Sequence, residues 1–108
     1  MIQGHAIALI AAPSSLKSSS LRTFLGSIIK THITFEAYSL AETIQILKNR
    51  YVDLIVFDVD LSGDDLGACL QELRALKPQI HWIVLVNTAA QRQIAFDMGA
   101  NYALLKNY

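Results

Sequence analysis

The stretch YVDLIVFDVDLSG, residues 51–63, decides the fold of this chain. Its apolar run, Leu54 to Phe57, is bounded by a charged residue at each end. A run this short predicts a strand buried on both faces, as in the middle of a parallel sheet. Two carboxylates follow it, Asp58 and Asp60, and then a Ser-Gly turn. Because open α/β sheets carry their sites at the carboxyl ends of central strands, we expect any chemistry to lie around Asp58.

The composition indicates one domain spanning residues 1–108. Nine basic and nine acidic residues cancel, which removes the electrostatic argument for binding nucleic acid or an anionic membrane. No apolar run approaches the ~20 residues that cross a bilayer. A single cysteine, Cys69, excludes an internal disulfide and fits a reducing compartment, so we expect a cytoplasmic location.

Apolar periodicity predicts five strands that alternate with four helices. The expected strands are Ala6–Ala11, His32–Glu36, Leu54–Phe57, Ile80–Val86 and Tyr102–Leu105. The first expected helix carries Leu21 to Ile29, and the second begins at the capping box Ser39–Glu42. The third runs from Leu66 to Leu76, and the fourth runs from Thr88 to Met98 with Gly99 as a left-handed cap. This alternation predicts a flavodoxin-like three-layer α/β sandwich with a parallel sheet in the order 2-1-3-4-5. No glycine-rich nucleotide-binding motif occurs.

Taken in order, these segments resemble a response-regulator receiver domain over nearly the whole chain. DLIVFDVDLSG, residues 53–63, resembles the family's phosphoacceptor strand and turn, with Asp58 in the acceptor position. AFDMGAN, residues 95–101, resembles the end of the fourth helix, and Leu104-Leu105-Lys106 resembles the fifth strand with its phosphate-contacting lysine. The resemblance implies two-component signalling, in which a histidine kinase supplies a phosphoryl group to an aspartate with the help of Mg²⁺.

The positions that would hold Mg²⁺ depart from the family's pattern. The resemblance places an acidic pair where this chain reads Ala11-Ala12-Pro13, and no carboxylate lies between Met1 and Phe35. Mg²⁺ usually needs one or two protein carboxylates, and only Asp58 and Asp60 could contribute here. We therefore expect no resident metal or cofactor, although Asp58 and Lys106 keep the positions of acceptor and phosphate contact.

The positions that would report phosphorylation also depart from the pattern. In the family, a hydroxyl after the fourth strand and an aromatic residue on the fifth move together. Here the hydroxyl position falls on Val86, or on Thr88 after a slip of two residues, and the aromatic position holds Ala103. We therefore expect a degenerate switch.

The chain stops at Tyr108, where the resemblance implies a fifth helix after Lys106. Without that helix, we expect a bare apolar face over the strands at residues 80–86 and 102–105. Two explanations stay open. Residues 1–108 are the N-terminal part of a longer protein, whose next segment covers the face and leads to an output domain. Alternatively, a second copy of the chain covers it in a symmetric dimer.

Three functions are therefore considered. The favoured one is a pseudo-receiver, not an enzyme, that signals by contact with a histidine kinase, an output domain or a second copy, without normal Mg²⁺-dependent phosphorylation. The second is a receiver phosphorylated on Asp58. The third is an unrelated small α/β enzyme using Asp58, Asp60 and Lys106, which no nucleophile or cofactor motif supports.

Overall fold

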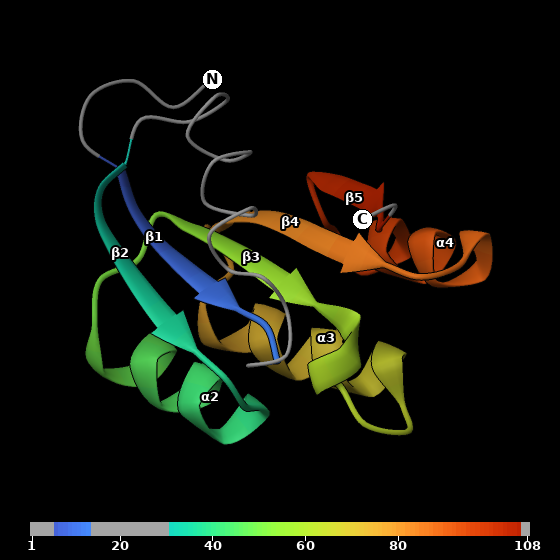
Figure 1. Ribbon diagram of the computed structural model, residues 1–108, viewed down its shortest axis with the longest axis horizontal. Coiled ribbons are helices and arrows are strands. Elements are labelled where there is room, and N and C mark those ends of the chain that lie inside the picture. Colours follow the sequence, from blue (N-terminus) through green and yellow to red (C-terminus); the bar gives the residue numbers. More distant parts are fainter. Residues whose placement is uncertain (1–5, 14–30, 107–108) are drawn as a thin grey trace.

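A computed structural model describes residues 6–13 and 31–106 of the chain. Five parallel strands form one sheet in the order β2-β1-β3-β4-β5 (Figure 1). The strands are β1 (Ala6–Ala11), β2 (Thr31–Ala37), β3 (Leu54–Asp58), β4 (His81–Val86) and β5 (Tyr102–Leu105). The predicted strand order is confirmed, and every predicted strand end lies within one residue of the observed one.

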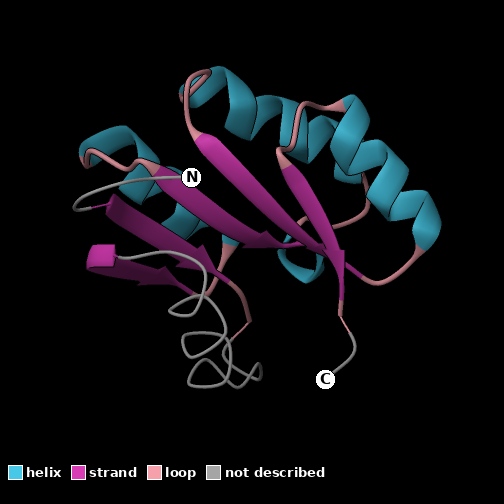
Figure 2. Cartoon of the chain, turned by 90° about the horizontal axis from the view of Figure 1, so that it is seen from above, coloured by secondary structure: helices cyan, strands magenta, loops and turns pink. Residues whose placement is uncertain are grey.

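Three α-helices cover one face of the sheet in the part of the chain that the structure describes (Figure 2). They are α2 (Leu40–Asn49), α3 (Leu66–Leu76) and α4 (Ala89–Asp97), and a short 3₁₀ helix, η1 (Val59–Leu61), follows β3. The first predicted helix, over Leu21 to Ile29, lies outside the described residues. None of the described helices is long and apolar enough to cross a membrane.

Each of these α-helices begins at a side chain that accepts a hydrogen bond from its first turn, as helix N-termini require. The N-caps are Ser39, Asp65 and Thr88. The predicted start of α2 at Ser39 is confirmed, because the Glu42 backbone N–H donates to Ser39 Oγ at 3.1 Å; the Glu42 side chain accepts from the Tyr38 backbone N–H, one residue before the cap. At the other end of α4, Gly99 has a φ of +96°, the left-handed conformation expected of a C-terminal cap.

Alternating side chains of the strands build two apolar clusters, one on each face of the sheet. The cluster on the helix-covered face includes Leu9, Phe57 and Trp82. On the other face, Ile83 and Leu85 of β4 pack with residues of β1 and β3 and are buried. The expectation of a bare face is therefore wrong for β4, since its side chains join that second cluster.

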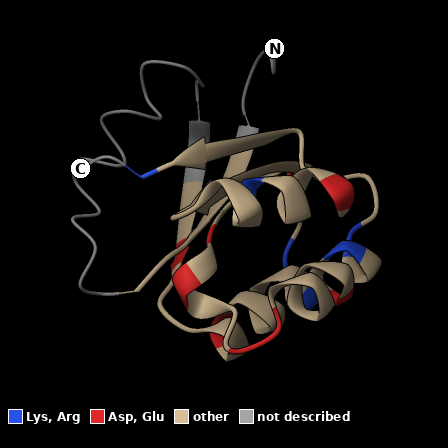
Figure 3. Cartoon of the chain, turned by 90° about the vertical axis from the view of Figure 1, so that its right-hand side faces the viewer, with Lys and Arg blue, Asp and Glu red and all other residues tan. Residues whose placement is uncertain are grey.

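Apolar surface remains exposed on β5, the strand at the edge of the sheet. Tyr102 and Leu105 are 62% and 42% exposed, and Phe96 of the neighbouring α4 is also exposed. Acidic and basic residues are intermixed over the described helices (Figure 3), in keeping with the formal net charge of zero.

The sheet register brings the carboxyl ends of three strands together. Asp58, the last residue of β3, pairs with Leu85 of β4. Val86, the last residue of β4, pairs with Leu105 of β5, and the Lys106 backbone N–H donates to the Val86 carbonyl at 2.9 Å. The residues that follow β3, β4 and β5 therefore meet at the carboxyl-terminal end of the sheet.

Candidate functional site

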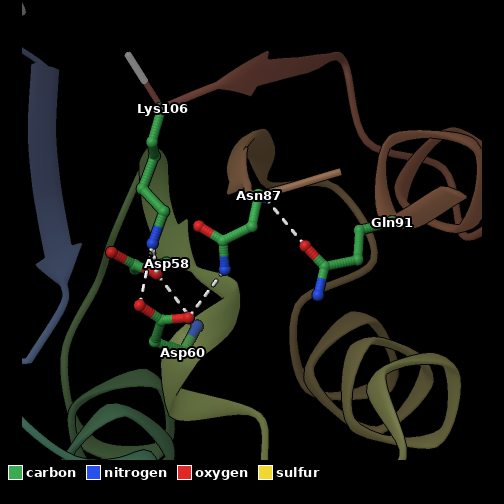
Figure 4. Close-up of polar contacts among 5 residues, drawn as sticks. All are labelled: Asp58, Asp60, Asn87, Gln91 and Lys106. Carbon is green, nitrogen blue, oxygen red and sulfur yellow. Dashed lines mark hydrogen bonds and ion pairs between the residues drawn. The ribbon is translucent and has the colours of Figure 1, made fainter. Parts of the chain in front are cut away.

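Asp58 and Lys106 meet at the carboxyl-terminal end of the sheet, although they lie 48 residues apart in the sequence. Lys106 Nζ is 2.8 Å from Asp58 Oδ1 and 2.9 Å from Asp60 Oδ2 (Figure 4). The Asp58 side chain is only 1% exposed and that of Lys106 is 10% exposed. The structure thus joins the two residues for which the resemblance implies the acceptor and phosphate-contact positions, with one ammonium between two carboxyl groups.

Asp60 completes the cluster from the turn that follows β3. Its backbone N–H donates to Asp58 Oδ1 at 2.9 Å, so that Asp58 caps η1. Its own side chain is 51% exposed and accepts hydrogen bonds from Lys106 and from Asn87 Nδ2, the latter at 2.8 Å. The tight turn therefore directs the Asp60 carboxylate back toward the strand ends.

The contacts shift the pKa values of two groups in opposite directions. Hydrogen bonds from Lys106 and then Asn87 hold the pKa of Asp60 below its usual value. Burial alone would lower the pKa of Lys106, but hydrogen bonds to Asp58 and Asp60 outweigh burial and raise it. Each partner thus stabilises the charged form of the other at neutral pH.

The second oxygen of Asp58 tests whether the site fits a metal ion. Asp58 Oδ2 is buried and has no hydrogen-bond partner. The side chains at the end of the neighbouring strand add no oxygen ligand, since Ala11 pairs with Phe57 and both Ala11 and Ala12 are buried alanines. Among residues 6–13 and 31–106, no three His, Cys, Asp or Glu side chains gather where they could hold a metal. The donor set is two carboxylates that already share the Lys106 ammonium, and with no further acidic side chain beside them in the described part of the chain these residues do not fit Mg²⁺.

The side chains at the predicted switch positions form no hydrogen bond with the Asp58–Lys106 pair. Val86 and Ala103 are buried in the apolar core between the sheet and the helices. Thr88 is the N-cap of α4, and its hydroxyl accepts a hydrogen bond from the Gln91 backbone at 3.1 Å. The Thr88 hydroxyl, which a two-residue slip would place at the switch position, therefore caps the start of α4.

Asn87 and Gln91 are part of the site, and sequence reasoning did not single them out. Asn87 Nδ2 donates to Asp60 Oδ1, and the Asn87 backbone N–H donates to Gln91 Oε1 at 2.8 Å (Figure 4). The Thr88–Gln91 spacing is that of a capping box and could have indicated Gln91. No local signal indicates the contact between Asn87 and Asp60, which are 27 residues apart.

The family model described as "Response regulator receiver domain" matches residues 9–108. The chain therefore belongs to the response-regulator receiver domains of two-component systems, which are signalling domains that interact with kinases and output domains and commonly bind Mg²⁺ or Ca²⁺ at the phosphorylation site. The hypothesis of an unrelated small enzyme is thereby removed.

Solved structures confirm the CheY-like fold. The isolated receiver domain of RcsB from Salmonella enterica serovar Typhimurium, with phosphomimetic BeF₃⁻, is 19% identical with a TM-score of 0.81; the match covers 97% of this chain and 80% of that one. A CheY-like receiver domain protein from Methanospirillum hungatei JF-1 is 17% identical with a TM-score of 0.77, over 97% and 84% of the two chains.

A third similar structure is a response regulator from Burkholderia pseudomallei with a phosphorylated aspartic acid, a calcium ion and citrate. It is 19% identical with a TM-score of 0.75, and the match covers 95% of this chain and 61% of that one. A comparison with curated protein sequences found no significant match.

Proposed function

We propose that this chain is an atypical receiver domain that signals by contact with a protein partner and not by Mg²⁺-dependent phosphorylation. One observation carries the proposal: the Lys106 ammonium bridges Asp58 and Asp60 at 2.8 and 2.9 Å. An incoming Mg²⁺ would have to displace this tethered cation. It would find buried Ala11 and Ala12 where further carboxylates would be needed.

The chemistry of phosphoryl transfer explains why this loss matters. Negative charge is spread over the equatorial oxygens of the phosphoryl group in the transition state, and metal ions usually neutralise much of it. Lys106 alone supplies one positive charge, and Asp60 shares it. A buried Asp58 that receives no metal would thus react slowly with any phosphoryl donor.

Intact-mass measurement tests the proposal directly. The protein is incubated with acetyl phosphate and Mg²⁺, beside a receiver domain that is known to be phosphorylated as the positive control. We expect no added mass here, whereas the positive control gains about 80 Da, the mass of a phosphoryl group that replaces a proton. A gain of about 80 Da that disappears in Asp58→Asn would overturn the proposal.

The same experiment would support the second candidate function, a receiver that accepts a phosphoryl group on Asp58 from a histidine kinase. The contact between Asp58 and Lys106 taken alone also fits this candidate, because the ammonium lies where it could neutralise a bound phosphoryl group; the added bond from Lys106 to Asp60 is what favours the first candidate. In that case Lys106 would have to release Asp60 as the metal enters, and Mg²⁺ alone would perturb the amide resonances of Asp60 and Lys106.

The partner contact is proposed to involve α4 and β5. Phe96, Tyr102 and Leu105 are exposed there, and exposed apolar groups of this kind mark interaction surfaces. The partner would be a histidine kinase, an output domain that follows the N-terminal receiver in a longer protein, or a second copy of the chain in the cytoplasm. Light scattering distinguishes the last case, since a second copy doubles the mass.

A further inference from the structure

Asn87 donates hydrogen bonds to two different elements, one from its side chain and one from its backbone. Its side-chain amide donates to Asp60 Oδ1 in the turn after β3, and its backbone N–H donates to Gln91 Oε1 in the first turn of α4. Figure 4 shows Asn87 between these two residues. A single exposed residue therefore connects the carboxylate–lysine cluster (Asp58, Asp60 and Lys106) with the start of a helix.

Tyr38, the residue before the N-cap of α2, occupies the position that Asn87 has before α4. It shows that a capped helix does not need a side-chain bond to a distant carboxylate. The Tyr38 backbone N–H donates to Glu42 Oε1 at 2.8 Å, as Asn87 does to Gln91. The Tyr38 hydroxyl, however, donates to Glu36, only two residues away in the sequence. The two caps share their backbone geometry, and only the cap of α4 is tied to a distant charged group.

We propose that Asn87 couples the carboxylate–lysine cluster to the first turn of α4. The path has three hydrogen bonds, from Lys106 Nζ to Asp60 at 2.9 Å, from Asn87 Nδ2 to Asp60 at 2.8 Å, and from the Asn87 backbone to Gln91 at 2.8 Å. Whatever moves Lys106 or Asp60 must break or stretch this path, and a partner bound at the start of α4 acts on the cluster in return.

This coupling goes beyond the proposed function, because it holds whether or not Asp58 accepts a phosphoryl group. It also assigns a positioning role that the expected switch residues do not fill. Val86 and Ala103 carry no polar side chain, and the Thr88 hydroxyl bonds within its own helix. Asn87 is the polar side chain that leaves the end of β4 and reaches the cluster.

Hydrogen exchange of the backbone amides tests the coupling, because a coupling claim needs a measured dependence of one site on another. The amides of Gln91 and Arg92 report the first turn of α4, and those of α2 serve as the internal control. Asn87→Ala removes the side-chain bond to Asp60 and keeps the backbone bond to Gln91. We expect about fivefold faster exchange at Gln91 and Arg92, the effect of losing one hydrogen bond of ordinary strength.

The double variant decides whether the effect passes through Asn87. Asp60→Ala should accelerate the same α4 amides to a similar extent, with no further acceleration when it is combined with Asn87→Ala. Gln93→Ala is the matched control, since its side chain bonds to Asp97 within α4 and should leave these amides unchanged. Wild-type exchange in Asn87→Ala, or additive effects of the two substitutions, would overturn the coupling.

Discussion

Lys106 is the residue on which the integrity of the site depends. Its ammonium is largely buried between Asp58 Oδ1 and Asp60 Oδ2, and the second oxygen of Asp58, Oδ2, is buried with no hydrogen-bond partner. Removing one member of a buried ion pair leaves an uncompensated charge, which costs more than the net stabilisation by the intact pair. Loss of Lys106 should therefore lower the stability of the fold as well as alter the site.

We expect Lys106→Met to lower the free energy of unfolding by about 3 kcal/mol, because buried Asp58 loses its counter-charge. Urea denaturation at neutral pH measures the change. Lys48→Met on the exposed face of α2 is the control and should change stability by less than about 0.5 kcal/mol. Adding Asp58→Asn to Lys106→Met should recover part of the loss; a double variant less stable than Lys106→Met alone would contradict this account.

The lowered pKa of Asp60 predicts a pH dependence on the acid side. A carboxyl group whose pKa is lower in the folded state stabilises the protein above its ordinary value of 3.8, and this stabilisation is lost as the pH falls through the lowered pKa. The stability difference between wild type and Asp60→Asn should thus be constant near neutral pH and shrink below the ordinary value. Urea midpoints across this range measure it.

Lys106 does not confound that measurement. Its pKa is raised above the ordinary value of 10.5, so its contribution is fully present below that value and is lost only as the pH rises further. A stability difference that persists unchanged to the most acidic pH at which the protein stays folded would show that Asp60 gains nothing from its contacts with Lys106 and Asn87.

At the scale of elements, Gly99 joins α3 to the end of α4. Gly99 has a φ of +96°, and its carbonyl accepts a hydrogen bond from Arg74 Nη1 of α3 at 2.9 Å. A Cβ at this position would lie 2.9 Å from the guanidinium carbon of Arg74. Any other residue here must therefore adopt a strained backbone and push Arg74 out of its contact.

We expect Gly99→Ala to destabilise the protein by about 2 kcal/mol, with backbone strain and the lost Arg74 hydrogen bond as the two causes. Gly63→Ala is the matched control, because Gly63 has a φ of +78° with open space around it, and should cost about 1 kcal/mol. Thermal denaturation ranks the variants. Equal losses at both positions would show that Arg74 contributes nothing at Gly99.

Gly67→Ala tests the opposite sign within a helix. Gly67 lies in the first turn of α3, where an added Cβ meets only ordinary contacts at 3.7 and 4.0 Å. Alanine is the better helix former, so we expect the variant to be as stable as wild type or up to about 1 kcal/mol more stable. Thermal denaturation beside Gly99→Ala measures the change, and a clear loss of stability would contradict the expectation.

At the scale of the whole molecule, the exposed apolar side chains of β5 and α4 predict weak self-association. Leu105 is 42% exposed at the edge of the sheet, beside the helix that carries exposed Phe96. Sedimentation equilibrium should show dimers at high protein concentration, weakened at least fivefold by Leu105→Lys. Tyr51→Lys, at another exposed aromatic residue outside α4 and β5, should leave the dimer unchanged; a strict monomer would contradict self-association and leave a different protein as the partner.

Much of this architecture was predictable because its signals are local. The continuous apolar run at Leu54–Phe57 predicts a buried strand, and all of its side chains are buried. The Ser39–Glu42 spacing predicts the start of α2 within one turn of the chain. The prediction of a bare face at β4 was wrong because Ile83 and Leu85 pack with side chains of β1 and β3, and no short segment encodes which strands become neighbours in the sheet.

The sequence by itself determined the order of the elements, the resemblance to the family, and the presence of Asp58 and Lys106 together with alanines at positions 11 and 12. Only the tertiary structure decided that Lys106 lies between Asp58 and Asp60, and that Asn87 reaches Asp60. The reason is physical: strand periodicity and helix caps depend on neighbours a few residues away. Contacts across 27 to 48 residues depend on how strand ends align in the sheet and on which way each side chain turns.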